Sequence, residues 1–374
     1  MADATKSAAA HLPVDGYDLF SPDFMASPCA HWRHMRASGC PVAHSDKWGG
    51  SWMVTGFDDI RAIALDQARF SSRAIEVSGP VPPVGGGLSM PPLTSGPPEH
   101  KAHRDLLMPL FMPERIATME PFIRGEARRL AEAIAAKGGG DAVGDYARPI
   151  ALAVLTHILD VPREMQATFS DWVVRLMRVG PQNQAVRKAA IEEKLAYLGK
   201  LLDERAQTPG DDAISHIAKA TIDGQPLGRK HKLGSLFLLT LAGADTTWSA
   251  IGASLWHLGT QPDDRNKILA EPEILRRTAM EELLRFYAPV TISRIANEDV
   301  ELHGPRIAAQ ERVILPLPAA NRDPSVFDNP DVVDLERKQN RHVTFSSGIH
   351  RCLGATLARM ELRVALEEWL RAMP

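Results

Sequence analysis

Cysteine is scarce in this chain, and its scarcity limits the class of protein. Three cysteines, Cys29, Cys40 and Cys352, occur among 374 residues. Domains that depend on disulfides carry more cysteines, in even numbers, so a disulfide framework is excluded and a reducing compartment is favoured. A cysteine that is not needed for a disulfide can instead serve the chemistry of a site.

The chain also has no large excess of charge of either sign. Lys plus Arg number 43 and Asp plus Glu number 46, which gives a formal net charge of -3. A nucleic-acid role has little support because such proteins carry a basic excess. Hydrophobic residues make up 44% and charged residues 24%, which is ordinary globular composition and argues against intrinsic disorder.

Long hydrophobic runs are missing as well. Residues 1–10 contain one Lys and short side chains but no apolar stretch, so they do not indicate a signal peptide. The most apolar helical stretch, residues 233–244, reaches Asp245 well short of a bilayer span. We therefore expect a flexible N-terminal tail over residues 1–17 and a cytoplasmic protein.

Pro and Gly gather in residues 78–98, which forbids regular structure there. Loops of this length inside a domain are often functional, so we interpret the segment as a lid or binding loop. A disordered linker would share its composition, and that alternative stays open.

The rest of the pattern is mainly helical. Apolar residues recur at three- and four-residue spacing, and short extended runs separate the helical segments. The predicted helices lie within residues 99–220, 233–258 and 353–373, with extended runs at 52–56, 300–303 and 313–317. An Asp is expected to cap the helix that follows residue 56. We predict one large, mainly α domain with small β-sheets over residues 18–374.

Residues 345–354 read F-S-S-G-I-H-R-C-L-G, a turn of small residues that leads to Cys352. We expect Cys352 in the first turn of a helix, where unpaired N–H groups stabilise a thiolate as metal ligand or nucleophile. Gly348 and Gly354 have no Cβ, so a flat macrocycle could lie against the backbone. A small buried hydrophobe is the alternative interpretation of this cysteine.

The spacing F-x-x-G-x-H-x-C-x-G resembles the haem-binding loop of cytochrome P450 enzymes. The resemblance implies that Cys352 is the thiolate ligand of haem iron, within a loop that includes Phe345 and His350. It also implies a haem between the long central helix and this loop. The chain departs from the family at Ser346, where Gly is usual.

Residues 242–247 read A-G-A-D-T-T in the middle of an otherwise apolar helix. A Thr inside a helix can bond a carbonyl one turn back and loosen the helix locally. The segment resembles the oxygen-activating part of the family, with Ala242 and Gly243 beside the haem. Thr246 would hold water and donate a hydrogen bond to dioxygen, and Asp245 would connect that water to a proton source. A buried Thr beside a partly solvated Asp is the structural alternative.

Haem carries two propionates, whose burial requires cationic or hydrogen-bonding partners. The resemblance assigns that role to His100 and Arg104 on one helix face, to Arg294 after an apolar run, and to His350. Each residue alone could equally be a surface charge or a capping side chain.

Two further patterns match the family. Glu282 and Arg285 are three residues apart on one helix face, and the resemblance implies a structural ion-pair network with Arg337. Residues 320–324, A-N-R-D-P, resemble the corresponding segment of bacterial members.

Family members usually continue into a small sheet after the cysteine helix, whereas 22 residues follow Cys352 here, so we expect the domain to lack that segment.

The candidate substrate walls are mostly apolar and predict a hydrophobic substrate. They are Ile75, Val77, Val81, Val84, Leu88, Met90, Leu238, Leu239, Ala242 and residues 290–292.

The resulting hypothesis is a haem b monooxygenase that inserts one oxygen atom from dioxygen. The chain has too few cysteines for a Cys₄ iron–sulfur cluster, so a separate ferredoxin or flavodoxin with its reductase is implied. We expect that partner to dock on cations, namely Arg351, Arg359 and Lys101.

Three alternatives are weaker. A peroxide-driven peroxygenase would not need the Asp245–Thr246 pair, and a non-catalytic haem-binding protein would not turn over substrate. Zinc held by Cys352, His350 and His342 would lack a fourth ligand.

Overall fold

The computed structural model describes residues 16–39 and 41–374, so most of the predicted tail and Cys40 lie outside the described residues. The described residues form two compact units. Unit 1 comprises the described residues up to Leu88 together with Ala288–Val333 and Asn340–Arg351, and unit 2 comprises Ser89–Tyr287, Asp334–Gln339 and Cys352–Pro374. The single domain over residues 18–374 stays a prediction.

Unit 1 is built on a five-stranded sheet whose order is β1-β2-β9-β6-β3. β2 and β9 run parallel, and the other neighbours in the sheet are antiparallel. The strands are β1 Val42–Ser45, β2 Ser51–Val54, β3 Phe70–Ser71, β6 Thr291–Ala296 and β9 Arg312–Pro316, with a separate pair β7 Val300–Glu301 and β8 Arg306–Ile307. The runs at 52–56 and 313–317 were predicted as extended, but β6 was not, because its Ser and Arg interrupt the apolar pattern.

Helices pack on this sheet to close the core of unit 1. They are α2 Pro22–Ala26, α3 Pro28–Ala37, α4 Phe57–Leu65 and α15 Leu317–Ala320. Phe57 and Ile60 of α4 share a buried cluster with Val313 of β9. The prediction that a neighbouring Asp caps this helix is wrong. Gly56 is the N-cap and makes no side-chain hydrogen bond. The carboxylate at the helix start belongs to Asp323, whose Oδ2 accepts a hydrogen bond from the Phe57 N–H at 2.8 Å.

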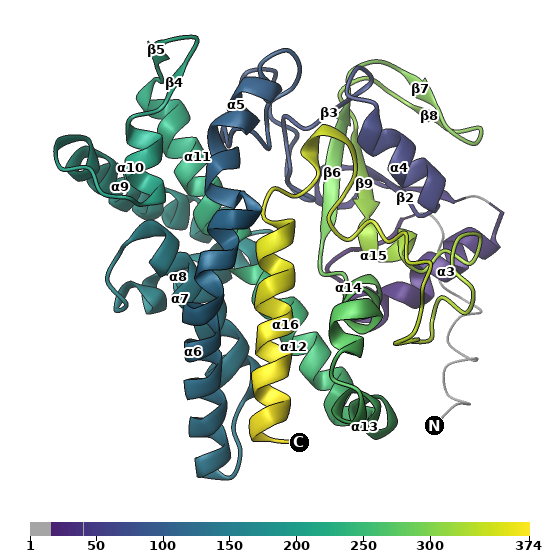
Figure 1. The fold of residues 1–374 in the computed structure, drawn as a ribbon. Coiled ribbons are helices and arrows are strands. Elements are labelled where there is room, and N and C mark those ends of the chain that lie inside the picture. The colour runs from purple at the N-terminus through teal and green to yellow at the C-terminus, as the bar shows by residue number, and fades with distance from the viewer. Residues whose placement is uncertain (1–15, 40) are drawn as a thin grey trace. The chain divides into compact units, whose positions relative to one another are not determined.

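Unit 2 holds the longer helices (Figure 1). They are α5 His100–Leu107, α6 Pro113–Lys137, α7 Arg148–Leu159, α8 Met165–Val174, α9 Gln184–Gln207, α10 Ala213–Ala218, α11 Arg229–Ala242, α12 Asp245–Thr260, α13 Pro262–Ala270, α14 Met280–Phe286 and α16 Ala355–Ala372, with a hairpin of β4 Thr221–Ile222 and β5 Gln225–Pro226. Pro113 begins α6, and Gly138 ends it in a left-handed conformation (φ 74°). The prediction of a mainly α fold with small sheets is confirmed.

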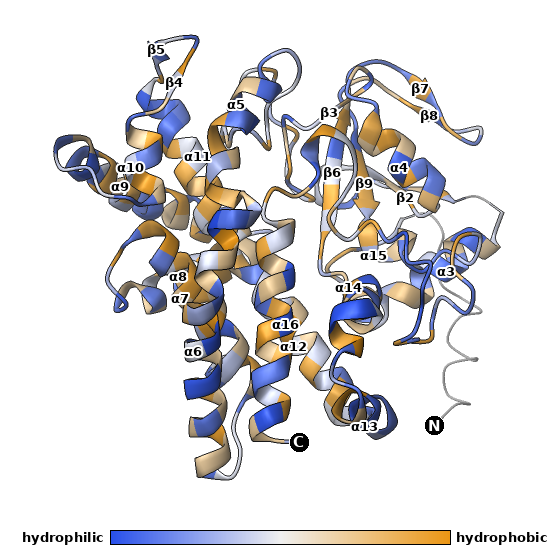
Figure 2. Cartoon of the chain, in the orientation of Figure 1, coloured by the Kyte–Doolittle hydropathy of each residue, from blue (hydrophilic) through white to orange (hydrophobic). Residues whose placement is uncertain are grey.

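α6 and α16 run side by side, and hydrophilic positions recur along both (Figures 1 and 2). Arg124 on α6 pairs with Glu367 at 2.6 Å and with Glu368 at 2.8 Å on α16. Arg363 on α16 pairs in return with Glu120 on α6 at 2.7 Å. The two helices are therefore joined by a network of charges as well as by their apolar faces.

Taken together, α11, α12 and the turn between them (residues 229–260) are long and apolar enough to cross a membrane by length and composition. Half of their most apolar window is buried inside the protein. A buried core helix passes the same test, so this stretch is weak evidence for a membrane span.

Candidate active site

The long central helix predicted over residues 233–258 is two helices. α11 ends at Ala242, and α12 begins at Asp245, with Ala244 between them at φ -97° and ψ -74°. Thr246 Oγ1 donates a hydrogen bond to the Ala242 carbonyl oxygen at 2.8 Å. The predicted loosening of the helix by an interior Thr is therefore present, and it falls where the sequence placed the polar residues.

Small residues are exposed at this interruption. Ala242 and Gly243 are exposed, although Ala244 and Thr247 beside them are buried. A ligand can therefore approach the helix backbone at the point where Thr246 and Asp245 are held.

Asp245 has a charged partner that the sequence did not reveal. Arg178, in the π-helical turn Arg175–Val179 that follows α8, lies 3.4 Å from Asp245 Oδ1 through its Nη2. The Asp245 side chain is 22% exposed and that of Arg178 is 55% exposed. No local spacing connects residues so far apart in the chain, so only the packed structure could find this pair.

Cys352 is exposed and precedes α16 by three residues. The prediction that it lies within the first helical turn is wrong, because Gly354 is the N-cap and the helix begins at Ala355. The influence of the helix dipole decreases beyond the first turn, so it contributes less to a thiolate here than expected. A Cβ on Gly354 would lie 3.7 Å from Phe111, an ordinary contact.

The turn before the cysteine requires left-handed backbone at two positions, within unit 1. Ser346 has φ 60° and Gly348 has φ 73°. A side chain is strained at both, which explains why Gly suits position 346 better than the Ser present here. A Cβ on Gly348 would also come 2.9 Å from the Ala64 carbonyl oxygen, so this glycine is needed for packing against the end of α4.

Arg294 is the most informative of the predicted anion-binding residues. It lies on β6, is 2% exposed, and donates from Nη1 to the Ser293 carbonyl oxygen at 2.8 Å. Its Nε and Nη2 have no hydrogen-bond partner among the described residues. Burial lowers the pKa of Arg294 to about 10. A buried cation left without a carboxylate fits an anionic group supplied by a ligand.

The other three predicted residues are also placed inside their units. His350 is buried in unit 1. His100 and Arg104 lie one turn apart on α5 in unit 2, and His100 is buried. Burial, followed by the charge of Arg104, lowers the pKa of His100. Of the predicted site residues, Arg294, Phe345, Gly348 and His350 belong to unit 1, and the others belong to unit 2.

These residues fit a haem on their own chemistry. A cysteine thiolate is a ligand for iron, a buried guanidinium without a carboxylate suits a propionate, and exposed small residues leave room beside a helix.

The predicted network of Glu282, Arg285 and Arg337 is present. Arg285 donates from Nε and Nη2 to the two oxygens of Glu282, both at 2.7 Å, and both side chains are 0% exposed. Arg337 Nε donates to Glu282 Oε2 at 3.0 Å. All three lie in unit 2, and their mutual pairing indicates a structural role.

Asn321, in the A-N-R-D-P segment, has a structural role that the sequence did not specify. Its Nδ2 donates to Thr344 Oγ1 at 2.8 Å, and its Oδ1 accepts from the Val343 N–H at 2.8 Å. It therefore holds the start of the segment that leads into the cysteine loop.

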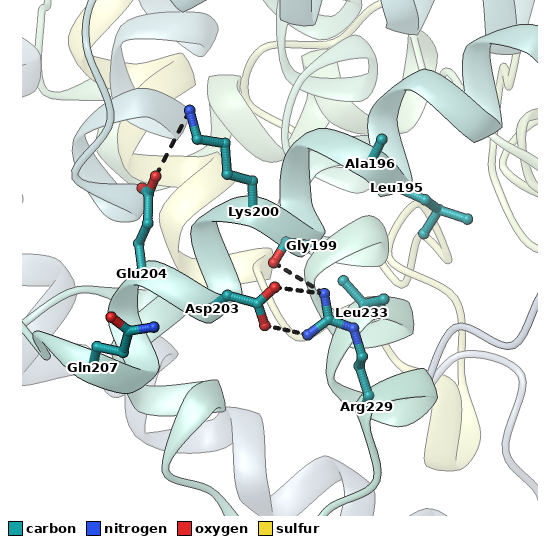
Figure 3. A pocket seen from close by; sticks show the side chains of 9 residues that line it. All are labelled: Leu195, Ala196, Gly199, Lys200, Asp203, Glu204, Gln207, Arg229 and Leu233. Atoms are coloured by element: carbon teal, nitrogen blue, oxygen red, sulfur yellow. Dashed lines mark hydrogen bonds and ion pairs between the residues drawn. The ribbon is translucent and has the colours of Figure 1, made fainter.

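A groove of about 440 Å³ between α9 and α11 contains none of the predicted site residues (Figure 3). Arg229 spans it, pairing with Asp203 and donating from Nη2 to the Gly199 carbonyl oxygen at 3.2 Å. Its guanidinium is already matched within the fold, which indicates a structural role.

Comparison with known proteins agrees with these observations. The family model described as Cytochrome P450 matches residues 173–373. Probable cytochrome P450 127A1 of Sinorhizobium fredii is 35% identical over 97% of this chain and 89% of that protein. The mycinamicin IV hydroxylase/epoxidase of Micromonospora griseorubida is 34% identical over 87% of this chain and 82% of that protein.

Solved structures show the same similarity. The Bacillus subtilis bacillaene polyketide synthase cytochrome P450 PksS has a TM-score of 0.86 and 28% identity, covering 96% of this chain and 92% of its own. P450BioI, in complex with an acyl carrier protein ligated to hexadec-9Z-enoic acid, has a TM-score of 0.83 and 30% identity, covering 94% and 93%.

Proposed function

The chain belongs to the cytochrome P450 family of haem-thiolate monooxygenases, and we propose that it transfers one oxygen atom of dioxygen to a hydrophobic small molecule. The observation that supports this most is the interruption between α11 and α12. There Thr246 Oγ1 donates a hydrogen bond to the Ala242 carbonyl oxygen, and Asp245 is its neighbour in the first turn of α12. A peroxygenase or a non-catalytic haem carrier would not need this pair.

Cys352 would hold haem b through its thiolate, within the turn formed by Phe345, Gly348, His350 and Gly354. Arg294 and His350, with His100 and Arg104, would bind the propionates. Haem, when bound and supplied with two electrons, activates dioxygen for insertion into an organic substrate.

The reduction of one oxygen atom to water consumes protons, and the chain's own residues would deliver them. Thr246 Oγ1 donates its one proton to the Ala242 carbonyl, so in this arrangement it can accept a hydrogen bond from water but does not make the expected donation to dioxygen. Asp245 is partly exposed and can exchange protons with solvent. Arg178 would orient the Asp245 carboxylate, so we propose it as a positioning residue.

The substrate would be apolar because the candidate substrate walls are mostly apolar. Leu238, Leu239 and Ala242 lie on or near one face of α11. A terpenoid, aromatic, fatty or polyketide-like compound suits such a surface.

The electrons would come from a ferredoxin or flavodoxin with its reductase, in the cytoplasm. Arg359 is held by Glu281 in two hydrogen bonds of 2.6 and 2.9 Å, and Lys101 pairs with Asp105. Arg351 is exposed and is therefore the better candidate for docking.

Charge reversal tests the docking role. We expect Arg351→Glu to slow reduction by a surrogate ferredoxin, with a weaker effect at high salt. Lys188→Glu, on the exposed side of α9, is the matched control. An unchanged reduction rate in Arg351→Glu would exclude this residue from the docking surface.

The function itself is tested in two steps. The reduced protein under carbon monoxide should show the red-shifted band of thiolate-ligated haem, and Cys352→Ala should abolish it. Substrate-dependent consumption of reduced nicotinamide with a surrogate redox chain should then yield oxygenated product. Product formed only with added peroxide would support the peroxygenase, and haem binding without any product would support the carrier.

A further inference from the structure

Lys194, near the middle of α9, is buried with its charged end unmatched. The residue is 0% exposed, and its Nζ has no hydrogen-bond partner among the described residues. The ring of Phe237 on α11 lies 4.4 Å from Nζ, in a cation–π contact. A buried ammonium is costly unless it is paired and hydrogen-bonded, and an aromatic face offsets only part of that cost.

Carboxylates on α9 and on the elements packed against it are paired with other cations. Glu193 and Asp171 pair with Arg175, at 2.6 and 3.1 Å. Asp212, which precedes α10, pairs with Arg205 at 3.1 Å. α11 has no acidic residue. Within the described part of the chain, the fold therefore supplies no anion to the buried lysine, and burial alone lowers its pKa to about 7.

The position of Lys194 along α11 relates it to the helix interruption within unit 2. Arg229, at the start of α11, bonds the Gly199 carbonyl of α9, and five residues earlier in α9 Lys194 meets α11 at Phe237. The two helices therefore run antiparallel. With a rise of about 1.5 Å per residue, Phe237 lies about 7.5 Å along the axis from Ala242.

The lysine side chain can also turn toward the apolar face of α11. Its four-carbon stem is flexible, and its ammonium has three rotatable donors. Nζ can therefore move from the Phe237 ring to a ligand beside Leu238, the next residue of α11. A molecule extended along α11 would then have one end at the helix interruption and the other end beside Lys194.

We propose that Lys194 binds a carboxylate of the substrate, so that the substrate is a hydrophobic acid whose apolar part extends along α11 toward Ala242. Lys194 is then a specificity-determining residue. An ammonium and a carboxylate form a charge-assisted hydrogen bond, which apolar surroundings strengthen. The proposal rests on the proposed function, because it takes Leu238 and Ala242 to be part of the substrate wall.

The experiment compares acids with their methyl esters in the haem-loaded full chain. Octanoic, decanoic and dodecanoic acids and their esters serve as probes, and the Soret shift gives the dissociation constants. We expect the wild type to bind the best acid about tenfold or more tightly than its ester, because the ester has no charge to pair with the ammonium. A pocket without a cation would favour the ester, since the carboxylate would lose its hydration there.

Lys194→Met keeps the length of the side chain and removes its charge. We expect this variant to bind the acid about tenfold or more weakly and to change binding of the ester by less than about twofold. A merely structural role of Lys194 would affect both ligands alike. Lys188→Met, at a 78% exposed side chain of α9, is the matched control and should leave both constants at the wild-type values.

The pH dependence of the wild type supplies a test that needs no variant. Lys194 loses its charge as the pH rises through about 7, while the carboxylate of the acid stays ionised. Binding of the acid should therefore weaken between pH 6 and 9, and binding of the ester should not. An effect of other groups on the elements packed against α9 would remain in Lys194→Met. These further charged or titratable groups are Arg178, His216, Arg229, Lys230, His231 and Lys232.

Three results would overturn the proposal. In the wild type, no acid of the series binding more tightly than its ester would exclude a carboxylate site. An acid preference that persists in Lys194→Met would exclude this lysine. If Lys194→Met fails to fold, an acid affinity that does not change with pH would exclude it as well. Failure of the proposed function would show differently, as absence of the red-shifted carbon monoxide band in the wild type.

Discussion

Arg285 and Arg294 are both fully buried arginines, but the first has a carboxylate partner and the second has only a backbone carbonyl. Arg285 is matched by the two oxygens of Glu282 at 2.7 Å each. Arg294 has one backbone carbonyl as hydrogen-bond acceptor, and two of its nitrogens have no partner among the described residues.

We interpret the difference as separating a structural charge, Arg285, from a charge that is available to a ligand, Arg294. A buried charge is costly unless it is paired and hydrogen-bonded, so a chain that leaves one unpaired requires a compensating group from elsewhere. Glu282 supplies that compensation for Arg285 within the fold. A haem propionate would supply it for Arg294.

The largest expected effect is on the matched pair. Arg285→Ala should lower the free energy of unfolding by about 3–5 kcal/mol, because it leaves Glu282 buried without its main partner. Urea unfolding followed by circular dichroism measures this. The double variant Arg285→Ala, Glu282→Ala should recover part of the loss. A change below about 1 kcal/mol in the single variant would mean that the pair is not structurally important.

Arg294→Met should have a different result. We expect little loss of unfolding free energy, because the variant removes an unpaired buried cation. Haem should dissociate roughly tenfold faster or more, since a hydrogen bond to a charged group is worth about 1.5–3 kcal/mol. Transfer of haem to an acceptor globin measures the rate. Equal haem retention in Arg294→Met and the wild type would remove Arg294 from the propionate set.

The ion pairs between α6 and α16 are matched charges like Arg285 and Glu282, and they should make the stability of the protein depend on pH in the acid range. Neighbouring arginines lower the pKa of Glu120 and Glu368 to about 2 in the folded protein, from an ordinary value of 4.5. Their stabilisation is therefore complete above pH 4.5 and is lost as the pH decreases toward 2. Thermal unfolding between pH 3 and 6 should show this decrease. Glu120→Gln should make it shallower, and an unchanged slope would contradict the assignment.

Substitution in the Arg178–Asp245 pair is expected to have the smallest effect on stability. Because Arg178 is more than half exposed, Arg178→Gln should change the free energy of unfolding by less than about 1 kcal/mol. Product formed per electron consumed should nevertheless decrease, because Asp245 would lose the group that orients it. Lys188→Gln is the matched exposed control. Unchanged coupling would leave Arg178 without a part in proton delivery.

Much of the candidate site could be predicted from short patterns. The cysteine loop, the A-G-A-D-T-T segment and the E-x-x-R pair are each contiguous, so their resemblance to the family's motifs could be recognised in the sequence. Helix boundaries were less accurate: the sequence did not show that α11 and α12 are separate, because the interruption contains residues that also occur inside helices. The cap of α4 was misassigned since its carboxylate comes from Asp323, far away in the sequence.

The sequence by itself determined the mainly α class, the candidate ligand cysteine and the polar residues of the central helix, because these depend on neighbours within one or two turns. Only the tertiary structure decided that Arg178 meets Asp245, that Arg294 is buried without a carboxylate, and that Lys194 packs against Phe237. These contacts join segments that are distant along the chain, so they depend on packing and leave no local pattern.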